Sequence, residues 1–248
     1  MNQKIIGILG GMGPEATLDL FHKIIRLSPV EKDQDHFRII IDNNPKIPDR
    51  TAAIFGKGEN PLPALQETAK NLEKAGADFI IMPCNTAHYF ISEIQQSIKI
   101  PILNMIKETA HHVKNIFPSI KNVGLLATKG TYKTGLYTSF FKEKTIEILI
   151  PSPLEQNKIM DIIYKIKSSI LSKEMKNQMI AISEEQIKKG AQAIIAGCTE
   201  IPLILKNEDL KVPVIDPTNI LAKKAIEVAK KQNILIVWLF QFKHLFYY

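Results

Sequence analysis

Short apolar runs alternate with longer amphipathic segments along the chain. The apolar runs are nearly continuous, which is typical of parallel strands that are buried on both faces. They predict strands at 5–10, 38–42, 78–82, 100–104, 122–128, 146–150, 193–197 and 212–216. The segments between them predict helices at about 14–27, 61–75, 86–98, 105–116, 131–143, 154–171, 173–189 and 217–231. This alternation favours an α/β fold with mainly parallel sheets.

The chain contains an internal repeat. The stretch AGADFIIMPCNTAH (75–88) aligns without gaps on KGAQAIIAGCTEIP (189–202), an offset of 114 residues that pairs Cys84 with Cys198. IIGILGG parallels NVGLLAT at an offset of 117 residues, and IPILN parallels VPVID at an offset of 112 residues. Three matches in the same order predict two similar α/β domains related by a pseudo-twofold axis, with the active site in the cleft between them.

The repeat also predicts how the chain divides. We expect a first α/β domain from residues 1–104 together with a C-terminal helix at 217–232, and a second from residues 105–216. Residues 233–248 form an atypical hydrophobic tail. Its apolar run is shorter than the roughly 20 residues of a membrane-spanning helix, and it contains Lys243 and His244. We therefore expect no stable membrane insertion, and either packing of the tail on its own domain or a partner chain, or a poorly ordered extension.

Charge and cysteine content exclude several classes of function. The net charge is +7, but the 29 lysines are scattered and are not interleaved with aromatic residues. We therefore expect a solvated lysine-rich surface and no nucleic-acid partner. The two cysteines are too few for a disulfide framework or for a metal site of their own. With no secretory leader in the sequence, we expect a cytoplasmic location.

The two cysteines occupy equivalent positions of the repeat, just past the end of a predicted strand. Open α/β sheets place their ligand sites at this edge. A single cysteine there is usually a small buried residue, but two thiols across one cleft suit inversion at a carbon, in which one group removes a proton and the other returns it. We expect the pKa of each thiol to be lowered by a helix that begins beside it and by neighbouring donors.

Four motifs that include both cysteines together resemble the aspartate/glutamate racemase family, and its aspartate racemases most closely. They are GILGGMGP (7–14), NNPKIPDR (43–50), PCNTAH (83–88) and GCTEIP (197–202), and the resemblance spans about residues 4–231. It implies two α/β domains with the site between them, racemisation of an amino acid without a cofactor or metal, and a homodimer. Cys84 and Cys198 are then the catalytic thiolate/thiol pair.

The substrate remains open at this point. L- and D-aspartate are the expected pair. Glutamate or another amino acid, or a dicarboxylate isomerase or decarboxylase reaction on the same fold, is the alternative. A non-enzymatic binder of acidic amino acids is a third reading from a different class.

Substrate-binding residues are expected around the cysteines. Arg50 is one of three arginines, and its planar fork matches a carboxylate; the alternative is a surface arginine paired with Asp49. Seven further residues have expected roles. Asn85, Thr86 and Thr199 would donate to the α-carboxylate. Met12 would line the pocket as in the family, and Lys167, with Lys165 as its rival, would contact the substrate. His88 and Glu200 would either assist proton exchange or serve only in helix capping and packing.

A glycine-rich turn follows the first predicted strand. Gly10, Gly11 and Gly13 let backbone N–H groups approach a ligand there. The stretch reads GGMGP, which does not match the spacing of a dinucleotide fingerprint. We therefore expect no cofactor-binding residues in this turn.

Overall fold

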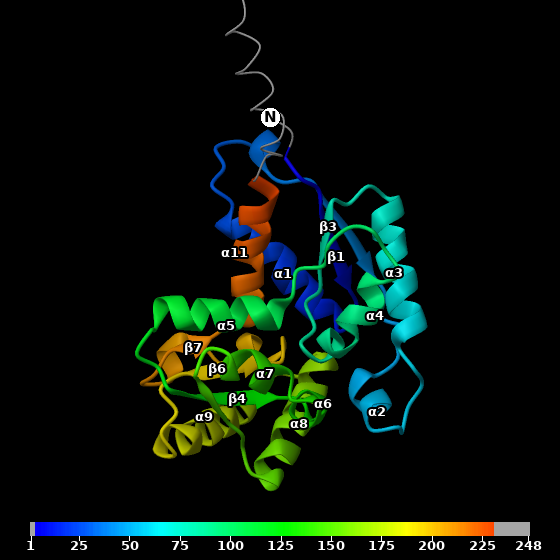
Figure 1. Ribbon diagram of the computed structural model, residues 1–248. Helices are drawn as coiled ribbons and strands as arrows, with labels where there is room; N and C mark the ends of the chain where they lie inside the picture. The colour runs from blue at the N-terminus through cyan, green and yellow to red at the C-terminus, as the bar shows by residue number, and fades with distance from the viewer. Residues whose placement is uncertain (1–2, 231–248) are drawn as a thin grey trace, which may run out of the picture.

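The computed structural model describes residues 3–230, which fold around two parallel sheets (Figure 1). The first sheet has the strand order β2-β1-β3, and the second has the order β5-β4-β6-β7. The strands are β1 (Ile6–Gly10), β2 (Ile39–Asn43), β3 (Phe79–Ile81), β4 (Asn122–Ala127), β5 (Glu147–Leu149), β6 (Ile194–Gly197) and β7 (Val214–Ile215). Every strand pair is parallel. The expected α/β fold with two parallel sheets is confirmed.

The helices connect these strands. The α-helices are α1 (Pro14–Leu27), α2 (Arg50–Ile54), α3 (Leu62–Lys74), α4 (Ile91–Gln95), α5 (Met105–Ile116), α6 (Lys129–Thr134), α7 (Leu136–Lys142), α8 (Pro153–Lys167), α9 (Lys173–Lys188), α10 (Ile201–Ile204) and α11 (Pro217–Lys230). The 3-10 helices are η1 (Asp33–Asp35), η2 (Thr86–Phe90) and η3 (Asn207–Asp209). Pro14 and Pro217 each occupy a first turn, where no backbone N–H is needed.

Most of the predicted elements form, with four local differences. The predicted strand at 100–104 contributes only a single bridge, between Ile102 and Ile80. The predicted helix at 131–143 breaks at Gly135, whose φ of 63° is left-handed. The segment 86–98 divides into η2 and α4, and α8 ends at Lys167. Helix α2 was not predicted, because its five residues are too few to show a helical period.

The repeat in the sequence is a repeat in the structure. If the bridge at Ile102 is counted as a fourth position, the strands of both sheets follow one another in the same order. Gly76 and Gly190, which the alignment pairs, both have a left-handed φ, of 94° and 100°. Each follows the helix before the third strand of its sheet, where glycine carries no steric penalty. Equivalent sequence therefore builds equivalent turns.

Helices cover both faces of each sheet. In the first sheet, apolar side chains of β1 and β3 pack against α1 and α11 on one face and against α3 and α4 on the other. In the second sheet, β4 and β6 pack against α8, α9 and α10 on one face and against α5 and α7 on the other. This double coverage explains why the strands are continuously apolar.

The last described helix returns to the first sheet. Helix α11 lies beside α1 in Figure 1, and its residues Leu221, Ala225 and Ala229 share a core cluster with β1. It also packs on α5. The division at residues 104 and 217 stays a prediction, and the hydrophobic tail at 233–248 lies outside the described residues. Within residues 3–230, no helix combines the length and apolar character needed to cross a membrane.

Candidate active site

A cavity at the carboxyl ends of the strands brings the expected site residues together. It is lined by Met12, Asp49, Arg50, Thr51, Cys84, Asn85, Thr86, Thr128, Met160, Ile163, Tyr164, Lys167, Cys198, Thr199 and Glu200. The list contains every residue that we expected to be catalytic or substrate-binding. Both cysteines are buried and unpaired by a disulfide. Two thiols from equivalent places in the repeat therefore border one cavity.

Cys84 lies three residues beyond β3, in a turn that its own neighbours hold. Its backbone N–H donates to the carbonyl of Met82 over 2.9 Å. Its carbonyl accepts from Nδ1 of His88 at 2.8 Å, and Nε2 of the same ring accepts from the backbone N–H of Met105 at 3.1 Å. Nδ1 is therefore the protonated nitrogen, because Nε2 is occupied as an acceptor.

His88 is a structural residue in this arrangement. It is fully buried, and burial lowers its pKa to about 4 although the carbonyl of Cys84 opposes the change. It does not line the cavity. A neutral ring with both nitrogens engaged cannot shuttle protons to the cavity. Of the two expectations for His88, the structure favours packing and capping.

Asn85 presents an amide donor in a fixed orientation. Its Oδ1 accepts from the hydroxyl of Tyr137 at 2.6 Å. Its Nδ2 is buried and has no hydrogen-bond partner among the described residues. A buried donor without a partner is costly unless a ligand satisfies it. Since Asn85 lines the cavity, its Nδ2 is available to an anionic ligand.

Thr86 belongs to a buried triangle of hydroxyl groups. Its Oγ1 lies 2.8 Å from Oγ1 of Thr128 and 3.1 Å from Oγ1 of Thr131. Thr128 is the N-cap residue of α6, where its Oγ1 accepts from the backbone N–H of Thr131. The triangle joins the turn after Cys84 to the beginning of α6, and so fixes this wall of the cavity.

Cys198 directly follows β6 and points to a carboxylate. Its Sγ donates to Oε2 of Glu200 over 2.9 Å, and Oγ1 of Thr199 donates to the same oxygen over 3.2 Å. Burial raises the pKa of Cys198 well above its ordinary value, and the charge of Glu200 adds to the effect while Lys167 opposes it. These surroundings keep the thiol of Cys198 protonated.

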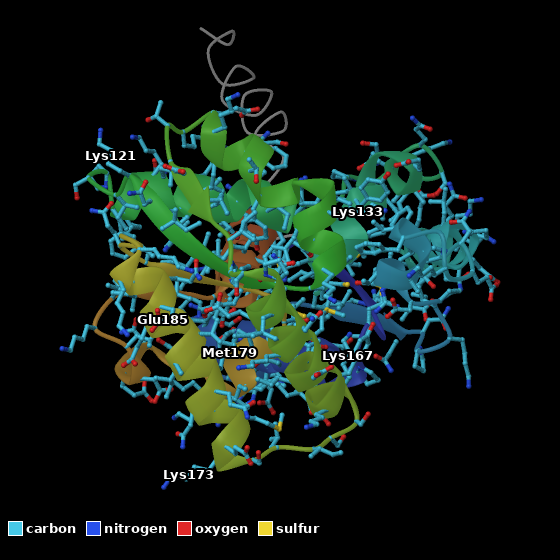
Figure 2. All side chains as sticks on the ribbon, turned by 90° about the horizontal axis from the view of Figure 1, so that it is seen from below. Lys121, Lys133, Lys167, Lys173, Met179 and Glu185 are labelled. Carbon is cyan, nitrogen blue, oxygen red and sulfur yellow. The ribbon has the colours of Figure 1, made fainter. Side chains whose placement is uncertain are left out.

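Lys167 connects this carboxylate to the first sheet. Its Nζ lies 3.2 Å from Oε1 of Glu200 and donates to the carbonyl of Met12 at 3.2 Å. Burial disfavours its charge, but the carboxylate of Glu200 outweighs this and raises the pKa of Lys167. Figure 2 shows Lys167 on α8, beside the blue segment of the first sheet. The rival Lys165 is exposed on the opposite side of the helix and does not line the cavity.

Arg50 is buried rather than a surface residue. Its Nη1 donates to the carbonyls of Ile47 and Pro48 at 3.0 and 2.9 Å, and its buried Nε has no hydrogen-bond partner within the described chain. Asp49 is the N-cap residue of α2, where it accepts from the backbone N–H of Ala52. No ion pair joins Asp49 to Arg50 among residues 3–230. The alternative of a surface pair is wrong.

The expected lowering of the pKa of Cys198 by a helix is wrong. The helix after Cys84 is the 3-10 helix η2, and the helix after Cys198 is α10, which has four residues beginning at Ile201. Few aligned peptide units produce only a small dipole. At Cys198, burial and Glu200 dominate and raise the pKa instead of lowering it.

Several cavity residues were not assigned from the sequence. Met160, Ile163 and Tyr164 lie on the face of α8 that carries Lys167, and a helical period counted back from Lys167 would have found them. Thr128 follows β4 and would have been found by its place after a strand. Thr51 and Asp49 gave no such signal, because α2 is too short to be predicted. No cluster of three or more His, Cys, Asp or Glu suited to a metal ion occurs among the residues described.

Several known proteins are similar to this chain in sequence and in fold. Residues 9–225 match the Asp/Glu/hydantoin racemase family. The broad specificity amino-acid racemase RacX of Bacillus subtilis (strain 168) is 31% identical over 228 residues, which cover 90% of this chain and 96% of the relative. The structure of Picrophilus torridus aspartate racemase has a TM-score of 0.80 at 36% identity, covering 92% of this chain and 95% of that one.

A second solved structure supports the same assignment. An aspartate racemase homologue from Pyrococcus horikoshii OT3 has a TM-score of 0.74 at 29% identity, and the match covers 93% of this chain and 100% of that one. The family resemblance that we inferred from the four motifs is thus confirmed. The chain belongs to the Asp/Glu/hydantoin racemase family.

Proposed function

We propose that this protein is an amino acid racemase that interconverts L- and D-aspartate without a cofactor, with Cys84 and Cys198 as its two acid/base groups. One observation carries the proposal: two cysteines from equivalent places in the repeat line the same cavity. Removal of a proton from one face of a carbon and return to the other face requires such a pair of groups.

The cavity also supplies donors for the substrate's α-carboxylate. Asn85 offers an unpaired amide N–H, and the hydroxyl groups of Thr86 and Thr199 lie beside the two cysteines, where they would exchange their present partners for the carboxylate. When a thiolate removes the α-proton, the electron pair of the C–H bond moves toward the carboxylate. Donors that are already fixed in place stabilise the negative charge that develops there. The opposite thiol then gives its proton to the other face of the carbon.

The cationic side chains favour an acidic substrate. Arg50 has an unpaired Nε beside the cavity, and a guanidinium group binds a carboxylate with two parallel hydrogen bonds. The sequence similarity to aspartate racemases agrees with this choice. We assign Arg50 to the side-chain carboxylate of aspartate.

A second candidate is racemisation of neutral amino acids. The charge of Lys167 is balanced by Glu200, and the cavity lining holds two carboxylates, Asp49 and Glu200, for its two cations, Arg50 and Lys167. Met160 and Ile163 add apolar surface. RacX, which is similar over 90% of this chain, is a broad specificity amino-acid racemase.

Isotope exchange tests the proposal and ranks the substrates. L-aspartate, L-glutamate and L-alanine are incubated separately with the protein in deuterated water, and chiral chromatography with mass spectrometry follows the D-enantiomer and the α-deuterium. We expect both to appear fastest with aspartate. The control is the double variant Cys84→Ala/Cys198→Ala. Binding of aspartate without any deuterium incorporation would instead identify a binding protein.

Two expectations from the sequence are not addressed by this assay. The homodimer and the cytoplasmic location stay predictions. Light scattering of the purified protein would determine its oligomeric state.

A further inference from the structure

The helix that carries Arg50 depends on contacts with the other half of the chain. Helix α2 has only five residues and lies within the long connection between β2 and α3. A helix of this length is not stable by its own hydrogen bonds. Its neighbours in space are α6 and η2. The position of Arg50 therefore depends on what holds α2 in place.

The beginning of α2 sits directly against α6. A Cβ atom built on Gly130 would lie 2.9 Å from Oγ1 and 3.2 Å from Cα of Thr51, and 3.0 Å from Cγ2 of Thr86. A side chain at position 130 would force the neighbouring atoms of Thr51 and Thr86 to shift, so the absence of a Cβ permits this close approach. Gly130 therefore packs directly against the N-terminal end of α2, which carries Arg50.

The end of α2 is held by Lys133, one turn further along α6. Its Nζ donates to the carbonyl of Ile54 over 3.1 Å and lies 4.2 Å from the centroid of the Phe55 ring. A cation at the C-terminal end of a helix satisfies a carbonyl that has no partner within the helix. The ring of Phe55, which is 39% exposed, adds a cation–π contact. Figure 2 labels Lys133 where the green helices meet the cyan segments.

We propose that Lys133 is a positioning residue that holds α2 closed over the cavity and thereby fixes Arg50 for the substrate's side-chain carboxylate. Lys133 acts on Arg50 through the backbone of α2, because it contacts Ile54 and Phe55 at the other end of this helix. The carbonyls that hold its guanidinium belong to Ile47 and Pro48, in the same connection as α2. The guanidinium therefore moves with this segment. The proposal rests on the proposed racemase function only for its effect on turnover.

Four variants test the kinetic effect. Lys133→Met keeps the aliphatic stem but removes the charge and the donor, and Phe55→Leu removes the ring. We expect each to raise the KM for aspartate about three- to tenfold with kcat changed less than about twofold, as expected for a weakened exposed cation–π contact. Lys133→Arg should restore most of the affinity, because arginine can make both contacts. Lys142→Met, at an exposed lysine on α7, is the control and should change nothing.

The double variant and a second substrate separate positioning from general destabilisation. Lys133→Met/Phe55→Leu should be little worse than Lys133→Met alone, because Lys133→Met has already removed the cation–π contact that Phe55→Leu removes. The KM for alanine should not change, because alanine has no side-chain carboxylate for Arg50. An equal increase in KM for aspartate and alanine would overturn the proposal that Lys133 acts by positioning Arg50.

Hydrogen exchange tests the closed position of α2 without any reference to activity. The backbone N–H groups of Ala53, Phe55, Gly56 and Lys57 are bonded within the segment. In Lys133→Met they should exchange faster than in the wild type, while the amides of α7 should not. Unchanged exchange in 50–57 would overturn the proposal. If the wild-type protein racemises no amino acid, the proposed function fails, and the exchange result alone decides whether Lys133 holds α2.

Discussion

The Sγ atom of Cys198 lies 2.9 Å from Oε2 of Glu200 and donates to it. The repeat places Thr86 where the second half has Glu200, so the two cysteines occupy equivalent places in the chain but have different electrostatic neighbours. A carboxylate beside a buried thiol stabilises the protonated form. The site is therefore asymmetric, with a carboxylate that holds the proton on Cys198 and no equivalent carboxylate at position 86 beside Cys84.

Replacement of Glu200 should release this proton. In Glu200→Gln, the negative charge that helps to raise the pKa of Cys198 is gone, while Lys167 remains and favours the thiolate. We expect the pKa of Cys198 to fall. The measurement is the pH dependence of Cys198 alkylation by iodoacetamide in a Cys84→Ala background, followed by mass spectrometry. Glu208→Gln, at an exposed glutamate in η3, is the control. A pH midpoint of Cys198 alkylation that is unchanged or higher in Glu200→Gln would contradict the role assigned to Glu200.

Single-cysteine variants should separate the two faces of the reaction. Cys84→Ala and Cys198→Ala each leave one acid/base group, and we expect each to lower the racemisation rate by about 100-fold or more, the usual size of a lost general acid or base. The remaining cysteine can still exchange the α-proton of one enantiomer with solvent. Each variant should therefore incorporate deuterium into L- or D-aspartate but not both. Near-wild-type racemisation by either variant would rule out the two-base mechanism.

The fold was largely predictable because its signals are local. Continuous apolar runs mark strands that are covered on both faces, and all of the strands coincide with such runs. The alignment of Cys84 with Cys198 placed both cysteines at strand ends, which in parallel sheets lie at the edge that forms the site. The single bridge at Ile102 shows the limit of this reasoning. A short apolar run alone does not indicate how many ladder hydrogen bonds will form.

The chemistry of the site was less predictable because it depends on contacts between distant residues. The proximity of Lys167 to Glu200 and to the carbonyl of Met12 arises from the packing of α8, which no local pattern encodes. For the same reason, the raised pKa of Cys198 could not be anticipated from a lone cysteine beside a threonine. The contact of Lys133 with Phe55 joins two exposed residues, and exposure gives no periodic signal.

His88 should make the protein less stable in mild acid. Burial lowers its pKa from 6.5 to about 4, so the folded state binds this proton more weakly than the unfolded state. The stability that the folded state gains from holding this ring neutral is fully present above pH 6.5 and is lost as the pH falls to about 4. The free energy of unfolding should fall by roughly 3 kcal/mol across this range from this group. Urea titrations at several pH values measure it. A variant His88→Gln with an undiminished acid slope would contradict the assignment.

Gln186 should be replaceable with a gain in stability. It is fully buried in α9, and neither Oε1 nor Nε2 has a hydrogen-bond partner in the described chain. The repeat pairs it with Leu72, a buried core residue of the first half. Gln186→Leu should raise the free energy of unfolding by about 1–3 kcal/mol in urea titrations, because an unsatisfied polar group is removed at nearly constant volume. The exposed control Gln178→Leu should stay within about 0.5 kcal/mol of the wild type. A loss of stability in Gln186→Leu would show that the amide has a partner.

Arg50 should determine the preference for an acidic side chain. Its guanidinium is buried at the cavity with an unpaired Nε, so a carboxylate that binds there gains a charge-assisted hydrogen bond. Loss of one partner of a buried charge pair costs about 2–5 kcal/mol, or roughly 30- to several-thousand-fold in kcat/KM. Arg50→Ala should cause a loss of this size for aspartate and a much smaller one for alanine.

Two further variants make the test of Arg50 specific. Arg50→Lys should recover only part of the activity on aspartate, because an ammonium group cannot make the two parallel hydrogen bonds of a guanidinium group. Lys165→Ala removes an exposed cation of α8 outside the cavity and should leave both substrates unaffected. Steady-state kinetics of each variant give the ratio of kcat/KM for aspartate to that for alanine, which shows whether Arg50 determines the side-chain preference. If Arg50→Ala lowers kcat/KM equally for the two substrates, Arg50 acts on the α-carboxylate that they share, and the side-chain preference must come from another cavity residue.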